Sequence, residues 1–170
     1  FISHDSINYF ENSLNIKKNK NCECFKFGIF LDGLIYDQMT GEIFYYFYEE
    51  SRITEIEKIL NKKLSSNKNV KTKFLRDSMT KEEHRKTVLK IKDDIKNGLI
   101  FQCEVGFKSH YEIEGDLTKI YSKLRSLNPS PHMYFMKFMD QVIIGASPEL
   151  LFRLKNGEME TFPLAGTTKR

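Results

Sequence analysis

Two short segments near the end of the chain carry residue types suited to acid–base chemistry and anion binding. The first, Gly145-Ala146-Ser147-Pro148-Glu149, sets small residues beside a carboxylate, and its proline favours an extended backbone at Ser147. A carboxylate presented in this way can act as a general acid or base. The second, Ala165-Gly166-Thr167, is a turn of small residues, where backbone amides can approach a bound anion closely. Each segment alone is equally typical of an exposed turn.

A β-hairpin is predicted between these two segments. Residues Leu150–Leu154 and Glu158–Phe162 have the composition of strands, and Asn156-Gly157 is a turn signal because both residues tolerate a positive φ. Pro163 is expected to end the second strand.

Taken together, in this order and spacing, the pieces resemble the signature of the chorismate-utilising enzymes: GASPELLxR, a short hairpin, then P-[IL]-A-G-T-x-x-R. Residues 145–170 match it almost throughout. Upstream, residues 97–102 resemble the family's G-x-I-F-Q-V-V-L-S strand, and residues 121–133 resemble its Y-x-x-L-R-x-x-N-P-S-P-Y-M segment. The opening Phe1–Asp5 is similar to a Y-I-S-Y-D element, so the resemblance covers nearly the whole chain, with little of it in residues 12–75.

Two positions separate the branches of this family. Isochorismate and salicylate synthases carry a lysine, the base that activates water, where this chain has Gln102. Aminodeoxychorismate synthases commonly carry a nucleophilic lysine where this chain has Ala165, whose methyl group cannot attack a substrate. The resemblance is therefore to anthranilate synthase component I, in which ammonia attacks chorismate and pyruvate is eliminated. Aminodeoxychorismate synthase stays the alternative, because Ala165 does not exclude every member of that branch.

The resemblance also implies roles for single residues. Glu149 would be the general acid that helps the ring hydroxyl of chorismate leave, and Gln102 would lie near the approach of the nucleophile. Ala165, Gly166 and Thr167 would line the substrate. Ammonia would come from a glutamine amidotransferase subunit, and Mg²⁺ would bridge the substrate carboxylate and acidic ligands. The family's magnesium-ligating glutamates lie beyond Arg170, so no metal ligand is assigned in this chain.

A further segment of the family lines a pocket for the feedback inhibitor tryptophan. The matching residues here are Asn128, Pro131, His132 and Met133. Two prolines with fixed φ also explain this segment as a rigid loop between a helix and a strand. Since His132 replaces the usual tyrosine and the family's L-L-E-S element is absent, tryptophan sensitivity stays open.

Composition and charge narrow the class of protein. The 170 residues are 40% hydrophobic with a net charge of +4, and the lysines of residues 17–20 and 58–73 are interleaved with Asn and Ser as on a solvated surface, without the aromatics of a nucleic-acid site. Without a signal peptide or a stretch of about 18 apolar residues, we expect a soluble cytoplasmic protein that binds no membrane. The three cysteines are expected to be free thiols.

The chain opens without Met and stops within a motif, which predicts a partial chain. We expect the isolated 170 residues to show no turnover, and an inactive binding module is the second class of function considered.

Periodicity predicts an α+β fold with helices layered on a largely antiparallel sheet. Thr80 and Glu83 form a capping box for a helix that Asn97-Gly98 ends. One face of this helix holds His84, Val88, Ile91 and Ile95, with His84 expected at the boundary of that face. Asp116 is expected to cap a second helix. The other predicted elements are strands at Cys24–Leu31, Gly33–Tyr36, Ile43–Tyr48, Met133–Met139 and Val142–Ala146 and a helix at Arg52–Leu64.

Three regions follow from these elements. Residues 1–64 are expected to be the carboxyl-terminal part of an amino-terminal, regulatory-type region. Residues 65–75 are expected to be a linker, and residues 76–170 the amino-terminal half of a chorismate-binding catalytic domain.

Overall fold

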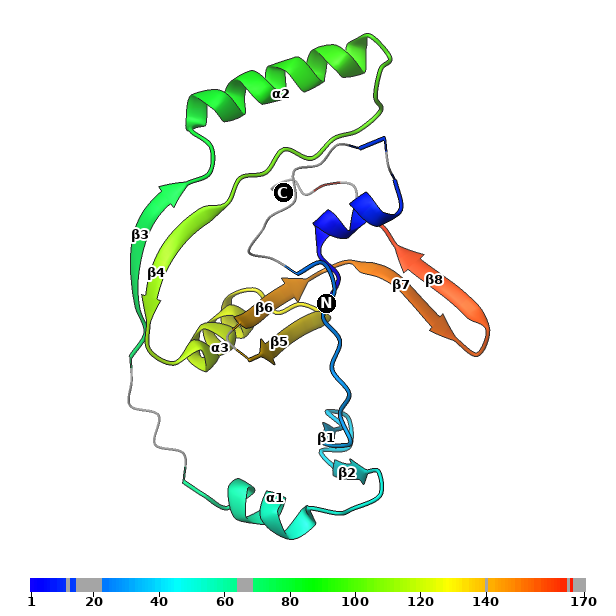
Figure 1. Ribbon diagram of the computed structural model, residues 1–170, viewed down its shortest axis with the longest axis vertical. Coiled ribbons are helices and arrows are strands. Elements are labelled where there is room, and N and C mark those ends of the chain that lie inside the picture. The colour runs from blue at the N-terminus through cyan, green and yellow to red at the C-terminus, as the bar shows by residue number, and fades with distance from the viewer. Residues whose placement is uncertain (12, 15–22, 64–68, 140, 165, 167–170) are drawn as a thin grey trace. The chain divides into compact units, whose positions relative to one another are not determined.

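The computed structural model describes residues 1–11, 13–14, 23–63, 69–139, 141–164 and 166 (Figure 1). The chain divides into two compact units, residues 1–64 and residues 65–170, which are described separately. In both units the described strands pair two by two and antiparallel. In the second unit one helix lies between the two strands of the first pair, and another lies between that pair and the next. The predicted α+β class with antiparallel strands is confirmed.

The first unit is a short helix, a hairpin and a second helix. Its elements are the 3₁₀ helix η1 (His4–Tyr9), strands β1 (Asp32–Tyr36) and β2 (Ile43–Phe47), and helix α1 (Ile53–Leu60). The predicted strand at Cys24–Leu31 is wrong: among the described residues this stretch makes one isolated bridge, Ile2 to Phe25. A strand needs a partner along its length, and its own composition does not supply one.

A polar cluster ties the β1–β2 hairpin to the start of α1. The Arg52 guanidinium donates from Nε to Asp32 Oδ2 at 2.8 Å and from Nη2 to Oδ1 at 3.0 Å. The Tyr45 hydroxyl donates to the same carboxylate at 3.2 Å and accepts from the Arg52 backbone N–H at 2.9 Å. The hydrogen bond from Arg52 lowers the pKa of Asp32, so the carboxylate remains ionised and fixes the helix entry.

The second unit begins with strand β3 (Lys71–Asp77), which pairs with β4 (Ser109–Glu114) across helix α2 (Lys81–Lys96). Strand β3 starts at Lys71, within the stretch of residues 65–75 that was predicted as a linker. The capping box of α2 is confirmed: Glu83 N–H donates to Thr80 Oγ1 at 3.2 Å, and Thr80 N–H donates to Glu83 Oε2 at 2.7 Å. At the other end Gly98 takes a φ of 73°, as expected of a helix stop.

The rest of this unit is helix α3 (Leu117–Leu127) and two hairpins. These are β5 (His132–Phe138) with β6 (Gln141–Ser147), and β7 (Leu150–Lys155) with β8 (Glu158–Phe162). Asp116 caps α3 by accepting from the Thr118 N–H at 2.9 Å, as predicted. The predicted β7–β8 turn is also confirmed, because Asn156 and Gly157 have φ of 53° and 83°.

Helix α3 packs on the β5–β6 hairpin, where the rings of Tyr121 and Phe135 meet edge to face with centroids 6.0 Å apart. The seven residues of β6 are all half-buried. Among the described residues, no apolar side chain is fully buried, and Ser6 is the one buried polar residue. In that same part of the chain, no helix is long and apolar enough to cross a lipid bilayer.

Candidate active site

Glu149 lies in the short turn between β6 and β7. Ser147, the last residue of β6, has the extended backbone that Pro148 was predicted to impose. Its hydroxyl accepts from the Glu149 N–H at 3.3 Å and donates to the Glu149 carbonyl at 3.1 Å. These local bonds fix the backbone of the glutamate, while its side chain is exposed and directed by other contacts.

The carboxylate of Glu149 binds the segment that follows the second hairpin. The Leu164 backbone N–H donates to Glu149 Oε1 at 3.0 Å, two residues after β8 ends at Phe162 and directly before Ala165. A charge-assisted hydrogen bond therefore joins the first motif to the residue that directly precedes the second motif in the sequence. With Oε1 accepting from this amide, a proton carried by Glu149 would lie on Oε2.

The predicted substrate cradle is described only at Gly166, since Ala165 and Thr167 lie outside the described residues. Gly166 is exposed, and a Cβ built on it meets no atom within 4 Å. The open space around this glycine leaves room for a ligand to approach its backbone.

The segment Asn128–Met133 meets the Glu149 turn at the open end of the β5–β6 hairpin. The Ser130 hydroxyl donates to the Ser147 carbonyl, and the strand register sets His132 opposite Ser147 and Met133 opposite Ala146. Asn128, Pro131 and His132 are exposed, and Met133 is half-buried. Ser130 was missed as a site residue in the sequence, although the Asn-Pro-Ser-Pro pattern contains it.

Gly145 is small because an aromatic ring crosses it. It pairs with Tyr134 on β5, and a Cβ built on Gly145 would lie 2.2 Å from Tyr134 Cζ and 2.4 Å from the hydroxyl oxygen. Any larger residue at this position must displace the ring. The glycine of the Gly-Ala-Ser-Pro-Glu motif thus serves the packing of the hairpin that precedes Glu149.

Gln102 lies in residues 99–108, between α2 and β4, and its side chain is exposed. The strand that the resemblance predicts around it is absent: within the described part of the chain, no strand pairs with these residues. No hydrogen bond between described residues joins Gln102 to Glu149 or to Leu164, whereas Glu149 bonds to Leu164 and Ser130 bonds to Ser147.

The described residues do not form a cluster of ligands for a divalent cation. They include no group of three or more His, Cys, Asp or Glu side chains that could hold a metal. The side chains on either side of Glu149 are a proline and a leucine, which offer no oxygen ligand. No step of catalysis is therefore assigned to a metal from this chain's own residues.

Comparison with known proteins places this site in a family. The chorismate binding enzyme family matches the chain over residues 1–170. The chain is 43% identical to anthranilate synthase component 1 of Leptospira biflexa and 34% identical to that of Methanothermobacter thermautotrophicus, in each case over 100% of this chain. It spans 37% and 36% of the length of those two relatives.

A solved structure gives the same result for the fold. Anthranilate synthase component I from Streptococcus pneumoniae TIGR4 superposes with a TM-score of 0.79 and 24% sequence identity, covering 94% of this chain and 40% of that one. Since the family matches every residue of the chain, including the Gly-Ala-Ser-Pro-Glu segment and the residues after β8, the chain belongs to the family of chorismate binding enzymes.

Proposed function

We propose that this chain is part of the chorismate-binding subunit of an anthranilate synthase, which converts chorismate and ammonia into anthranilate, pyruvate and water in tryptophan biosynthesis. The observation that supports it best is the hydrogen bond from the Leu164 N–H to Glu149 Oε1. It holds the carboxylate against Leu164, which directly precedes the small residues Ala165, Gly166 and Thr167 in the sequence, and a carboxyl group near a bound substrate can protonate a leaving group. The names of the relatives above support the same reaction.

In this proposal each residue keeps one role. Glu149 donates a proton from Oε2 to the ring hydroxyl of chorismate, which leaves as water while ammonia forms the new carbon–nitrogen bond. Loss of a ring proton and of the enolpyruvyl group, released as pyruvate, then gives the aromatic product. Ala165, Gly166 and Thr167 line the substrate, and Gln102 lies near the path of ammonia.

Other parts of the proposal rest on the resemblance. Ammonia comes from glutamine through an amidotransferase subunit in the cytoplasm, and turnover requires Mg²⁺. The described residues include no group of three or more His, Cys, Asp or Glu side chains that could hold this ion. Asn128, Pro131, His132 and Met133 form part of a tryptophan pocket. Ser130, within this segment, bonds to Ser147 beside Glu149. An inhibitor bound at residues 128–133 could therefore shift the Glu149 turn.

The test uses the complete gene product with chorismate, Mg²⁺ and ammonium, following anthranilate by fluorescence together with pyruvate. Glu149→Gln keeps a carbonyl oxygen that can accept from Leu164 but cannot donate an acidic proton, so we expect kcat to fall about 10²- to 10⁴-fold. Glu160→Gln is the matched control. It removes a carboxylate of the next hairpin that pairs with Arg153 at the surface, and such pairs contribute little.

The products also decide between branches. Aminodeoxychorismate without pyruvate would assign the chain to the other branch, and isochorismate would show that Gln102 does not exclude water as the nucleophile. A complete protein that consumes no chorismate would refute the proposal and favour a binding module.

A further inference from the structure

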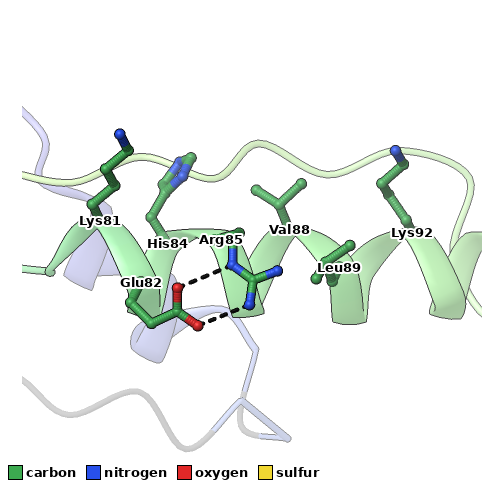
Figure 2. A pocket seen from close by; sticks show the side chains of 7 residues that line it. All are labelled: Lys81, Glu82, His84, Arg85, Val88, Leu89 and Lys92. Atoms are coloured by element: carbon green, nitrogen blue, oxygen red, sulfur yellow. Dashed lines mark hydrogen bonds and ion pairs between the residues drawn. The ribbon is translucent and has the colours of Figure 1, made fainter.

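His84 makes the contacts that hold the segment carrying Gln102. This histidine lies in the first turn of α2, and its Nε2 is 3.3 Å from the Val105 carbonyl oxygen. Its ring also meets Phe107 edge to face, with centroids 6.0 Å apart and planes at 82°. Figure 2 shows the imidazole on the side of α2 along which the following chain returns. A carbonyl only accepts, so this bond requires the tautomer with hydrogen on Nε2.

The segment is fixed at both ends by the backbone. At its start, the Leu99 N–H donates to the Asp94 carbonyl at 2.9 Å. At its end, the Lys108 carbonyl accepts from the Ser78 N–H at 2.7 Å, and the Lys108 N–H donates to Ser78 Oγ at 2.8 Å. Between these anchors, no described strand pairs with residues 100–107.

His84 is well placed to act as an anchor. The capping box fixes the turn from which it projects, and its side chain is half-buried rather than free in solvent. The neighbouring Arg85 and Glu82 bond to each other at 2.9 and 3.0 Å instead (Figure 2). In this turn of the helix His84 contacts the segment, while Glu82 and Arg85 pair with each other.

We propose that His84 is a positioning residue for ammonia delivery, because it fixes Val105 and Phe107 and thereby the backbone of Gln102 three residues upstream. This rests on the proposed function, in which Gln102 lies near the path of the nucleophile. Loosening the segment should weaken the use of ammonia and leave the protonation step at Glu149 unchanged. The expected signature is a rise in KM for ammonium with kcat and KM for chorismate nearly constant.

The experiment compares three variants of the complete gene product in the ammonium-dependent reaction. His84→Phe keeps an aromatic ring against Phe107 but loses the donor to Val105, and we expect KM for ammonium to rise about three- to tenfold, the range of one neutral hydrogen bond. His84→Gln keeps an N–H donor, so its KM for ammonium should stay close to that of the wild type. Arg85→Ala perturbs the same helical turn without touching the segment and should leave KM unchanged.

A second measurement does not depend on turnover. Glutamyl endopeptidase cleaves after Glu104, and its rate follows the population in which the segment is open. We expect His84→Phe to speed this cleavage by a similar factor, with Arg85→Ala as the control. An unchanged KM in His84→Phe, or an equal rise in Arg85→Ala, would overturn the positioning role.

The two proposals fail in different ways. If the wild-type protein makes no anthranilate, the proposed function is refuted, and so is the role of His84 in ammonia delivery. The cleavage rate then still decides whether His84 holds the segment, since an unchanged rate in His84→Phe refutes the anchor itself.

Discussion

Replacing Gly145 by alanine tests the packing that supports Glu149. The new Cβ would lie 2.2 Å from Tyr134 Cζ, whereas carbon atoms in contact are about 3.5 to 4.0 Å apart. The ring would therefore have to retreat by roughly 1.3 Å or more. Because Tyr134 is 41% exposed, its ring can turn outward without breaking the backbone pairing.

The size of the effect follows from two opposing terms. Overpacking costs about 1 to 3 kcal/mol, and the freedom of the ring to move favours the lower part of that range. Exchanging glycine for alanine inside a strand returns about 0.5 to 1 kcal/mol. We therefore expect Gly145→Ala to lower the free energy of unfolding by about 1 kcal/mol.

The effect of Gly145→Ala on the free energy of unfolding should change sign when the Tyr134 ring is removed. In a Tyr134→Ala background, Gly145→Ala should stabilise the protein by about 0.5 to 1 kcal/mol, a coupling of about 1.5 to 2 kcal/mol between the two positions. Urea unfolding of the complete gene product, followed by circular dichroism, measures all four free energies. Gly106→Ala is the control, because a Cβ there meets no atom within 4 Å.

An equal cost of Gly145→Ala with and without the Tyr134 ring would refute this reasoning. The glycine would then be required by its own backbone, and the crossing of the ring would be incidental.

Two further changes test the local signals of the second unit. Gly157→Ala places a side chain at a φ of 83° and should cost about 1 to 2 kcal/mol in urea unfolding, while a cost no larger than that of Gly106→Ala would contradict the assigned turn. Hydrogen bonds from the Thr80 backbone N–H and hydroxyl lower the pKa of Glu83 from its usual 4.5. The stabilisation of α2 by ionised Glu83 is therefore complete above pH 4.5 and is lost as the pH falls through the lowered pKa. A peptide of residues 77–99, followed by circular dichroism, should lose helicity as the pH falls. Glu83→Gln should make this loss smaller, leaving the part due to the Glu82–Arg85 pair. The same dependence of helicity on pH in both peptides would contradict the role of the capping box.

The elements with strong local signals could be predicted from the sequence. The Thr80–Glu83 capping box, the Asp116 cap and the Asn156-Gly157 turn each depend on residues a few positions apart, and such interactions form without the rest of the fold. Periodicity likewise located β5 and β6 within one or two residues.

What failed were features that need a distant partner. The strands expected at Cys24–Leu31 and around Gln102 have suitable residues, but the described chain offers no neighbouring strand along either of them. The contacts of His84 with Val105 and of Glu149 with Leu164 join residues 21 and 15 positions apart. The residue types alone do not predict these contacts, because the contacts depend on the path of the chain after a helix or a hairpin.

The bond between Ser130 and Ser147 has a consequence for how this protein can change over generations. It closes the open end of the β5–β6 hairpin, so the loop that enters the hairpin and the turn that leaves it meet. Under the proposed function the first loop is part of the inhibitor pocket and the second carries the acid, so we expect a substitution at Ser130 that breaks this bond to affect both. Selection on the two loops would then be coupled, and we expect an escape from feedback that breaks the Ser130 bond to lower catalysis unless the Glu149 turn changes with it.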